Sequence, residues 1–327
     1  MDKEGFRKYL EGRNASEETI LKYIAVGESF DGFLKEMGKE EATESTSSED
    51  VLAFVAFLMR EKLNTFDNFL GLIRYGQFLN NRRIYITAME LADGYEVMDN
   101  LYRKLGDAVG EQRRDEVFEG IELPPIGTPS IDKPRITQKV MERLQNLVDP
   151  EVCNKLLAPS LRNLDGSAFL EDRKKFIECG SLDAYLVRKG QEFIAELEKI
   201  KNEGRLYYTQ EITDEVIDFI RRTPLIAQGV REGNTLYEVK IPYMTKEYLA
   251  ENDERIKRYH ACHCPWVRES IRAGEGNIPP LFCMCSAGFV KKPWEVIFDQ
   301  PLEAEAVETL LAGDQWCKIA IRLPEGF

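Results

Sequence analysis

The amino-acid sequence predicts an α+β protein with an N-terminal helical bundle, a helical middle and a C-terminal α+β domain. In the first part, apolar residues recur at the three- and four-residue spacing of an amphipathic helix. After Pro224 the pattern changes to the alternation of a strand, and prolines and glycines gather in residues 121–134. We therefore predict a bundle over residues 1–120, a linker over 121–134, a helical segment over 135–222 and a cysteine-rich α+β domain over 223–327.

Composition and charge narrow the classes of function. The 327-residue chain is 43% hydrophobic with a net charge of −13, which is ordinary for a globular protein and disfavours one whose main task is binding phosphates. The first seven residues lack the apolar stretch of a signal peptide. The longest apolar run, residues 51–59, is far shorter than the roughly 18 residues of a membrane helix. We therefore expect a cytoplasmic protein with no membrane partner, whose cysteines stay reduced.

Capping residues and apolar spacing predict the helices of residues 1–110. Asn14 and Glu17 predict a capping box before a helix that runs to Met37, while Ser48 and Thr65 predict the starts of two more helices. A fourth helix is expected over residues 87–109. Together these helices predict a small bundle.

Residues 9–23, followed by Phe30 and Phe33-Leu34, and residues 65–79 resemble the core-binding domain of tyrosine recombinases. The resemblance implies a bundle that contacts DNA. The sequence has no His-x-x-Arg motif followed by a nucleophilic tyrosine, and the acidic balance of this segment disfavours DNA binding. A DNA-associated protein that binds through residues 1–110 is therefore an alternative hypothesis and not the leading one.

The rest of the chain is expected to change from helices to mixed structure. Helices are predicted after Thr137, from Pro150, over residues 182–200 and over 214–222, with Cys153 and Cys179 as small core or boundary residues. The last domain should contain strands over residues 235–243 and 257–264, a helix over 247–256, an extended segment over 281–285 and a helix over 286–298 interrupted near Pro293. Residues 302–311 and 316–323 are predicted to form a hairpin across Gly313-Asp314.

Cysteines and histidines concentrate in residues 260–317. Cys262-x-Cys264 and Cys283-x-Cys285 have the same internal spacing and are 18 residues apart. On a strand, residues i and i+2 point to the same face, so each pair can present its sulfur atoms together, with His260 on the side of Cys262. Thiolate and imidazole are the ligands of zinc and iron-sulfur centres. We therefore predict metal ligands at Cys262, Cys264, Cys283 and Cys285, with Cys317 or His260 nearby.

Two other interpretations of the cysteines stay open. Cys262 or Cys264 is a candidate thiol nucleophile, with His260 or His263 as a base and Arg268 as a countercharge. On a regular strand, however, His263 faces away from both cysteines. Alternatively, the cysteines only pack, because free cysteine is among the most buried residue types.

Cys264-Pro265-Trp266, then Cys283 with Gly288, and finally Gly313-Asp314-Gln315-Trp316-Cys317 resemble the vinyl-4-reductase-type domain. The stretch from about Thr209 onward is also similar to the L-2-amino-thiazoline-4-carboxylic acid hydrolase-like group and resembles a bacterial family of this kind. The resemblance implies an α+β fold that binds small molecules, and in some sensor proteins a zinc ion held by a Glu-x-x-Cys and the terminal cysteine. Ala306 and Thr309 occupy the Glu-x-x-Cys positions, so that zinc site is not carried over intact. Cys262 and Cys285 are additional to the pattern.

A ligand pocket beside the cysteines is also predicted. Arg231 lies in a turn-like Gly229–Asn234 stretch, and its planar guanidinium suits a carboxylate, although a solvated hairpin explains the same composition. The predicted ligand-binding residues are Arg231, Tyr237, Trp266 and Arg268. The leading hypothesis is a C-terminal domain that binds zinc or an iron-sulfur cluster, a small organic ligand, or both. A hydrolase-like enzyme that uses a cysteine thiolate is the main alternative.

Overall fold

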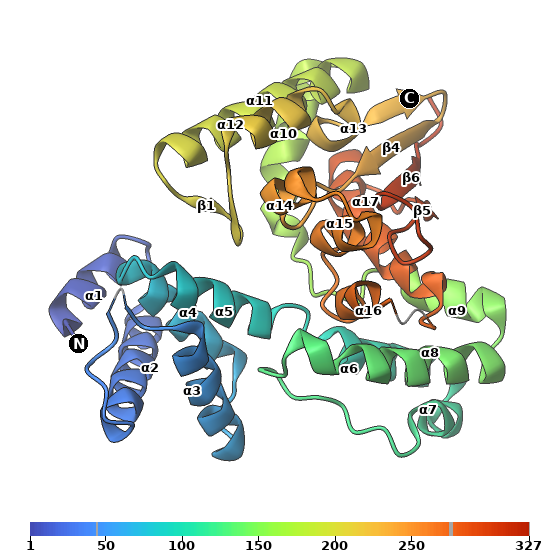
Figure 1. Cartoon of the computed structure of the whole chain (residues 1–327). Coiled ribbons are helices and arrows are strands. Elements are labelled where there is room, and N and C mark those ends of the chain that lie inside the picture. The colour runs from blue at the N-terminus through green and yellow to red at the C-terminus, as the bar shows by residue number, and fades with distance from the viewer. Residues whose placement is uncertain (44, 275–276, 327) are drawn as a thin grey trace. The chain divides into compact units, whose positions relative to one another are not determined.

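The computed structural model describes residues 1–43, 45–274 and 277–326, and the chain has an α+β fold, with most of its strands in the C-terminal part (Figure 1). It divides into two compact units, each described by itself. Unit 1 comprises Met1–Tyr95 with Pro124–Asp132, and unit 2 comprises Glu96–Leu123 with Lys133–Phe327. None of the described helices has the length and apolar character needed to cross a membrane.

Unit 1 is a helical bundle around an aromatic core that includes Phe30, Phe54 and Phe69. Its helices are α1 (Lys3–Glu11), α2 (Glu17–Glu36), α3 (Ser48–Arg60), α4 (Phe66–Phe78) and α5 (Arg82–Ala92). The predicted cap at Thr65 is confirmed, but two others shift by one or two residues. Ser16, not Asn14, caps α2, and Ser47, not Ser48, forms a capping box with Asp50 at the start of α3. Asn14 instead takes a positive φ of 57° in the turn before α2.

The units group the residues differently from the predicted domains. The predicted helix over residues 87–109 is two helices, α5 in unit 1 and α6 (Val97–Val109) in unit 2, separated by a turn that contains Gly94 at φ 60°. Much of the predicted linker packs on unit 1. Asn64 Nδ2 donates a hydrogen bond to Ile126 O at 2.9 Å. Gly127 has a φ of 100°, which favours glycine, and it lies so close to the side chain of Val55 that a Cβ at this position would clash with it.

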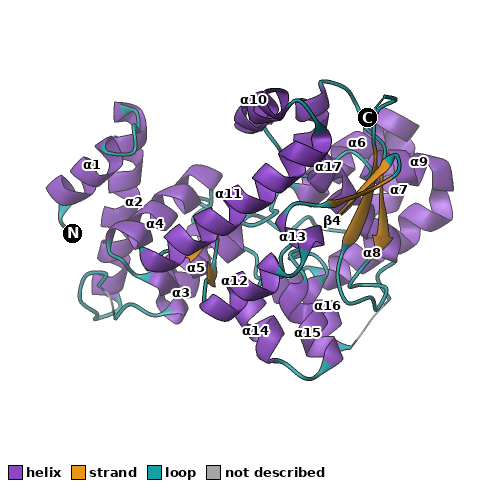
Figure 2. Ribbon diagram, turned by 90° about the horizontal axis from the view of Figure 1, so that it is seen from above, coloured by secondary structure: helices purple, strands orange, loops and turns teal. Residues whose placement is uncertain are grey.

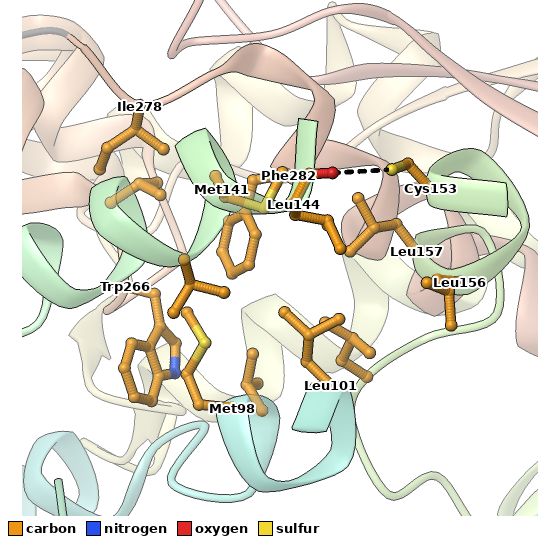
Figure 3. Close-up of a cluster of buried hydrophobic side chains, with 14 of the residues drawn as sticks. Met98, Leu101, Met141, Leu144, Cys153, Leu156, Leu157, Trp266, Ile278 and Phe282 are labelled. Atoms are coloured by element: carbon orange, nitrogen blue, oxygen red, sulfur yellow. Dashed lines mark hydrogen bonds between the residues drawn. The ribbon is translucent and has the colours of Figure 1, made fainter. Parts of the chain in front are cut away.

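A layer of helices in unit 2 forms one side of a large apolar core (Figure 3). It is made by α6, α7 (Glu111–Phe118), α8 (Pro134–Leu147) and α9 (Pro150–Leu157). Met98, Leu101 and Leu144 meet Trp266 and Phe282, which belong to the cysteine-rich part of the chain. Cys153 is buried in this core and its Sγ lies 3.7 Å from Leu144 O, which confirms the prediction that it is a core residue.

The remaining helices of unit 2 surround two antiparallel sheets (Figure 2). The helices are α10 (Leu170–Cys179), α11 (Leu182–Asn202), α12 (Asp214–Arg221), α13 (Pro224–Ala227), α14 (Thr245–Ala250), α15 (Glu254–Ala261), α16 (Arg268–Ala273) and α17 (Met284–Phe298). A small sheet pairs β1 (Leu206–Tyr207) with β2 (Gln210–Glu211). The larger sheet has the order β3-β4-β6-β5, made of β3 (Val230–Glu232), β4 (Thr235–Val239), β5 (Ala304–Glu308) and β6 (Lys318–Arg322).

One face of the larger sheet carries Leu236, Ile319 and Ile321, which pack with Trp294 and Ile297 of α17. The predicted strand within residues 235–243 is confirmed as β4, and the predicted pairing of residues 302–311 with 316–323 is confirmed as β5 and β6. The connection between β5 and β6 is longer than a two-residue turn. Thr309 N donates to Asp314 Oδ2 at 2.8 Å and closes a loop that runs to Cys317.

Four predicted elements of the cysteine-rich part are wrong. The helix predicted over residues 247–256 is broken after Ala250, and a second helix begins at Glu254. Residues 257–264 are mostly helix α15 rather than a strand, because Asp253 accepts hydrogen bonds from Arg255 N and Ile256 N and starts a helix. Residues 281–285 are not extended; a 3-10 helix (Pro280–Cys283) leads directly into α17. Helix α17 also continues through Pro293 to Phe298 without the predicted interruption.

Candidate functional site

The cysteines of residues 260–317 lie at the ends of elements in unit 2. Cys262 is the C-cap of α15, and Cys264 follows it in the connection to α16, where its carbonyl accepts from Val267 N and Arg268 N at 3.2 and 2.9 Å. Cys283 is the N-cap of α17, Cys285 lies in the first turn of that helix, and Cys317 directly precedes β6. Neither Cys-x-Cys pair is on a strand, so any convergence of the thiols comes from tertiary packing and not from a shared strand face.

Tertiary packing brings several of these cysteines to one region, because Cys262 belongs to the large apolar core of unit 2 and Cys264, Cys285 and Cys317 pack against the same core. Burial raises the pKa of the Cys283 thiol well above its usual value, and the nearby sulfur groups of Cys317, Cys262 and Cys264 raise it further. Burial likewise raises the pKa of Cys262, again with contributions from Cys264 and Cys317. These mutual interactions relate Cys262, Cys264, Cys283 and Cys317 to one another, and we call the four residues the thiol cluster. Cys262 is buried and the other three are half-buried.

A half-buried lysine, Lys240, lies near the thiol cluster. Lys240 follows β4, and its Nζ donates a hydrogen bond to Ser286 Oγ at 2.6 Å and lies 4.8 Å from the centroid of the Phe289 ring. Burial lowers the pKa of Lys240, while the thiols of Cys317, Cys285 and Cys264 raise it. No sequence pattern indicated this role, because a lysine that ends an alternating strand is usually exposed.

Cys285 lies against the loop that follows α9. Its Sγ accepts a hydrogen bond from Leu161 N at 3.4 Å, in the loop after α9. Burial raises the pKa of this thiol, whereas the cations of Arg162, Lys240 and Lys104 lower it. Cys285 is therefore the cysteine with a cationic environment, and sequence spacing could not indicate it because Leu161 and Arg162 are more than a hundred residues away.

The two histidines have different surroundings. His263 Nε2 lies 2.5 Å from Ile241 O, so the ring holds the chain after β4 against the connection between α15 and α16. His260 is half-buried in the last turn of α15, where its Nδ1 has no hydrogen-bond partner. Burial lowers the pKa of His260, with the carboxylates of Glu247 and Glu251 acting in the opposite direction.

The predicted ligand-binding residues do not form one group. Arg231 Nε donates to Gly233 O at 3.0 Å within the β3–β4 turn, and Tyr237 in β4 lies under Lys318 Nζ, 4.8 Å from the ring centroid. Trp266 is a fully buried core residue. Arg268 is also buried, between the rings of Tyr243 and Tyr259 with its guanidinium carbon 4.7 and 4.9 Å from the two centroids.

The zinc site implied by the vinyl-4-reductase resemblance would use the positions of Ala306, Thr309 and Cys317. Ala306 lies in β5 and offers no ligand, and Thr309 Oγ1 accepts a hydrogen bond from Ala312 N at 3.1 Å inside the β5–β6 loop. Within residues 1–43, 45–274 and 277–326, no three His, Cys, Asp or Glu side chains already stand in an arrangement that could hold a metal ion. The four thiols therefore influence one another but do not have the geometry of a metal site in the described part of the chain.

No protein-family model, curated protein or solved structure matches this chain. The likenesses to the vinyl-4-reductase type and to the recombinase core-binding domain therefore stay predictions from sequence motifs.

Proposed function

We propose that unit 2 binds a thiophilic metal, zinc or an iron-sulfur cluster, through the thiol cluster of Cys262, Cys264, Cys283 and Cys317. The observation that supports the proposal is that these four cysteines come to one region of unit 2 from the end of α15, the start of α17 and the start of β6. Four thiolates are the number that closes a tetrahedral zinc site or holds an iron-sulfur cluster. Cys264, Cys283 and Cys317 are also the positions that match the vinyl-4-reductase pattern.

The surroundings of the thiol cluster fit such a centre. A thiol is a weak hydrogen-bond donor and acceptor, so four thiols with little solvent contact gain little from their neighbours without a metal. A metal would replace their protons and supply free energy of folding. Four thiolates around a divalent ion leave net negative charge, which the ammonium of Lys240 is placed to offset. Two of the four ligands lie in or beside the non-helical connection between α15 and α16, where the sulfur atoms can approach one ion with the least disruption of helices.

We expect protein purified with a reducing agent and without air to contain stoichiometric zinc or iron by elemental analysis. Replacing Cys283 by serine should weaken metal binding by more than about 100-fold, since losing even an outer-shell partner costs 10–100-fold. Cys179→Ser is the matched control, because Cys179 lies at the end of α10 beside Arg188 and outside the thiol cluster. Affinities are measured by competition with a chromophoric chelator.

Protein that contains no metal and takes up neither zinc nor iron with sulfide would overturn the proposal. In that case the thiolate hydrolase alternative gains weight, and Cys285 is the residue to examine, because it has Arg162, Lys240 and Lys104 around it. One cysteine that is alkylated much faster than the others, identified by mass spectrometry as Cys285, would support this alternative. DNA binding by unit 1 has no structural observation in its favour.

A further inference from the structure

Unit 2 has a pocket of about 470 Å³ that lies outside the thiol cluster. One wall is a face of α6 with Asn100, Arg103 and Lys104, and the other is the loop of residues 160–165. The volume lies within the range of pockets that hold small organic ligands, roughly 300–1,000 Å³. None of the lining residues is among the site residues that were predicted from the sequence.

Hydrogen bonds fix the two walls to each other. Lys104 Nζ donates to Ser160 O at 2.9 Å, and Asn100 Nδ2 donates to Leu161 O at 2.8 Å and to Asn163 Oδ1 at 3.0 Å. The loop is also held from behind, where Leu161 N donates to Cys285 Sγ. The pocket is therefore formed before any ligand binds, which lowers the entropic cost of binding.

The pocket concentrates positive charge in a strongly acidic chain. Among the residues that the structure describes, Arg103, Lys104 and Arg162 line it together with one carboxylate, Asp165. That carboxylate accepts hydrogen bonds from Ser167 N at 2.9 Å and from the Ser167 hydroxyl, and so caps the turn that follows the loop. The whole chain has a net charge of −13, so a pocket lined by three cationic side chains differs in charge from the chain as a whole.

The cations of α6 have little competition from protein carboxylates. In the described part of the chain, no carboxylate lies within ion-pair distance of Lys104, whose hydrogen bonds go to backbone carbonyls. The carboxylate nearest to Arg103 is Asp107, at 3.9 Å in the next turn of α6. Partial burial lowers the pKa of Lys104, so a bound anion would stabilise its charged form.

We propose that this pocket binds a small organic anion through a phosphate or carboxylate group that contacts Arg103, Lys104 and Arg162. Guanidinium and ammonium groups donate charge-assisted hydrogen bonds to either kind of oxyanion, and the amides of Asn100 and Asn163 add neutral polar contacts. The site is beyond the proposed metal function and does not depend on it, because none of its residues belongs to the thiol cluster. The anion would sit next to Cys285, across the Leu161 hydrogen bond.

The proposal is tested on the full chain by isothermal titration with inorganic phosphate, pyrophosphate and citrate at constant ionic strength. We expect at least one of the three to bind with one site per chain, and its affinity to fall as sodium chloride is raised. Tighter binding of pyrophosphate than of citrate would identify the ligand class as phosphorylated, and the reverse order would identify it as a carboxylate.

Variants assign the binding to the pocket. Arg103→Gln and Lys104→Gln should each lower the affinity about tenfold, as expected for the loss of one charge-assisted contact. Lys155→Gln is the matched control, because Lys155 lies on α9 and pairs with Glu151 on the surface. Within the described ranges, the polar contacts of Arg103 are long, so Arg103→Gln remains informative even if Lys104→Gln disturbs the loop. No binding of any probe, or equal affinities for Arg103→Gln and the unaltered protein, would overturn the proposal.

Discussion

Replacing Gly288 by alanine is expected to destabilise unit 2 by about 3 kcal/mol or more, because overpacking against backbone cannot relax as it does against a flexible side chain. Gly288 lies in α17, where the loop after α9 crosses the helix. A Cβ at this position would lie 2.3 Å from both Ala158 O and Ser160 N, and 2.8 Å from Pro159 C. All three are backbone atoms, so the helix and the loop must separate.

This prediction is checked by urea unfolding followed by tryptophan fluorescence. The three tryptophans, Trp266, Trp294 and Trp316, all belong to unit 2, so fluorescence reports the unfolding of that unit. Gly32→Ala in α2 is the control, since a Cβ there meets nothing within 4 Å. It should leave the fluorescence transition unchanged and stabilise unit 1 by about 0.5–1 kcal/mol, seen by circular dichroism. A loss below about 1 kcal/mol for Gly288→Ala would contradict the close approach of loop and helix.

The contact at Gly288 also shows what sequence patterns could and could not predict here. Periodicity and capping residues predict the bundle of unit 1 and the strands of the larger sheet, because these depend on neighbours a few residues apart. They do not predict that the loop of residues 158–165 contacts α17 and α6. These contacts join residues that are far apart in sequence, and local spacing carries no information about them.

The cysteine-rich segment shows a second kind of limit. Alternation suggested strands at residues 257–264, but the cap at Asp253 and the helix-forming residues that follow it outweigh that pattern. The argument that paired thiols share a strand face was therefore wrong. The thiols of Cys262, Cys264, Cys283 and Cys317 nevertheless influence one another, because helix ends and a strand start come to the same region of unit 2. Lys240, which also lies near these thiols, follows strand β4, and no motif in that strand indicated a functional residue.

Truncation of Trp266 to alanine should destabilise unit 2 by about 3–5 kcal/mol, the usual cost of removing a buried tryptophan. Its side chain is 1% exposed and packs in the core that joins α6, α8 and α9 to the cysteine-rich part (Figure 3). Lys133 Nζ lies 5.4 Å from the Trp266 ring centroid, and Thr137 Oγ1 donates to Trp266 O at 2.9 Å. The cavity would therefore open between segments that are far apart in sequence.

Trp266 was also predicted from the sequence to bind a ligand. The Trp266→Ala variant distinguishes that role from a role in packing. A residue that only contacts a ligand would leave the urea midpoint unchanged when truncated, and Trp294 and Trp316 still report the transition. Trp266→Phe should recover a large part of the lost stability, because it restores an aromatic ring at the centre of the core. A midpoint unchanged in Trp266→Ala would contradict the structural role. A large loss in Trp266→Ala with recovery in Trp266→Phe means that the Cys264-Pro265-Trp266 motif anchors the thiol cluster to the helical layer of unit 2.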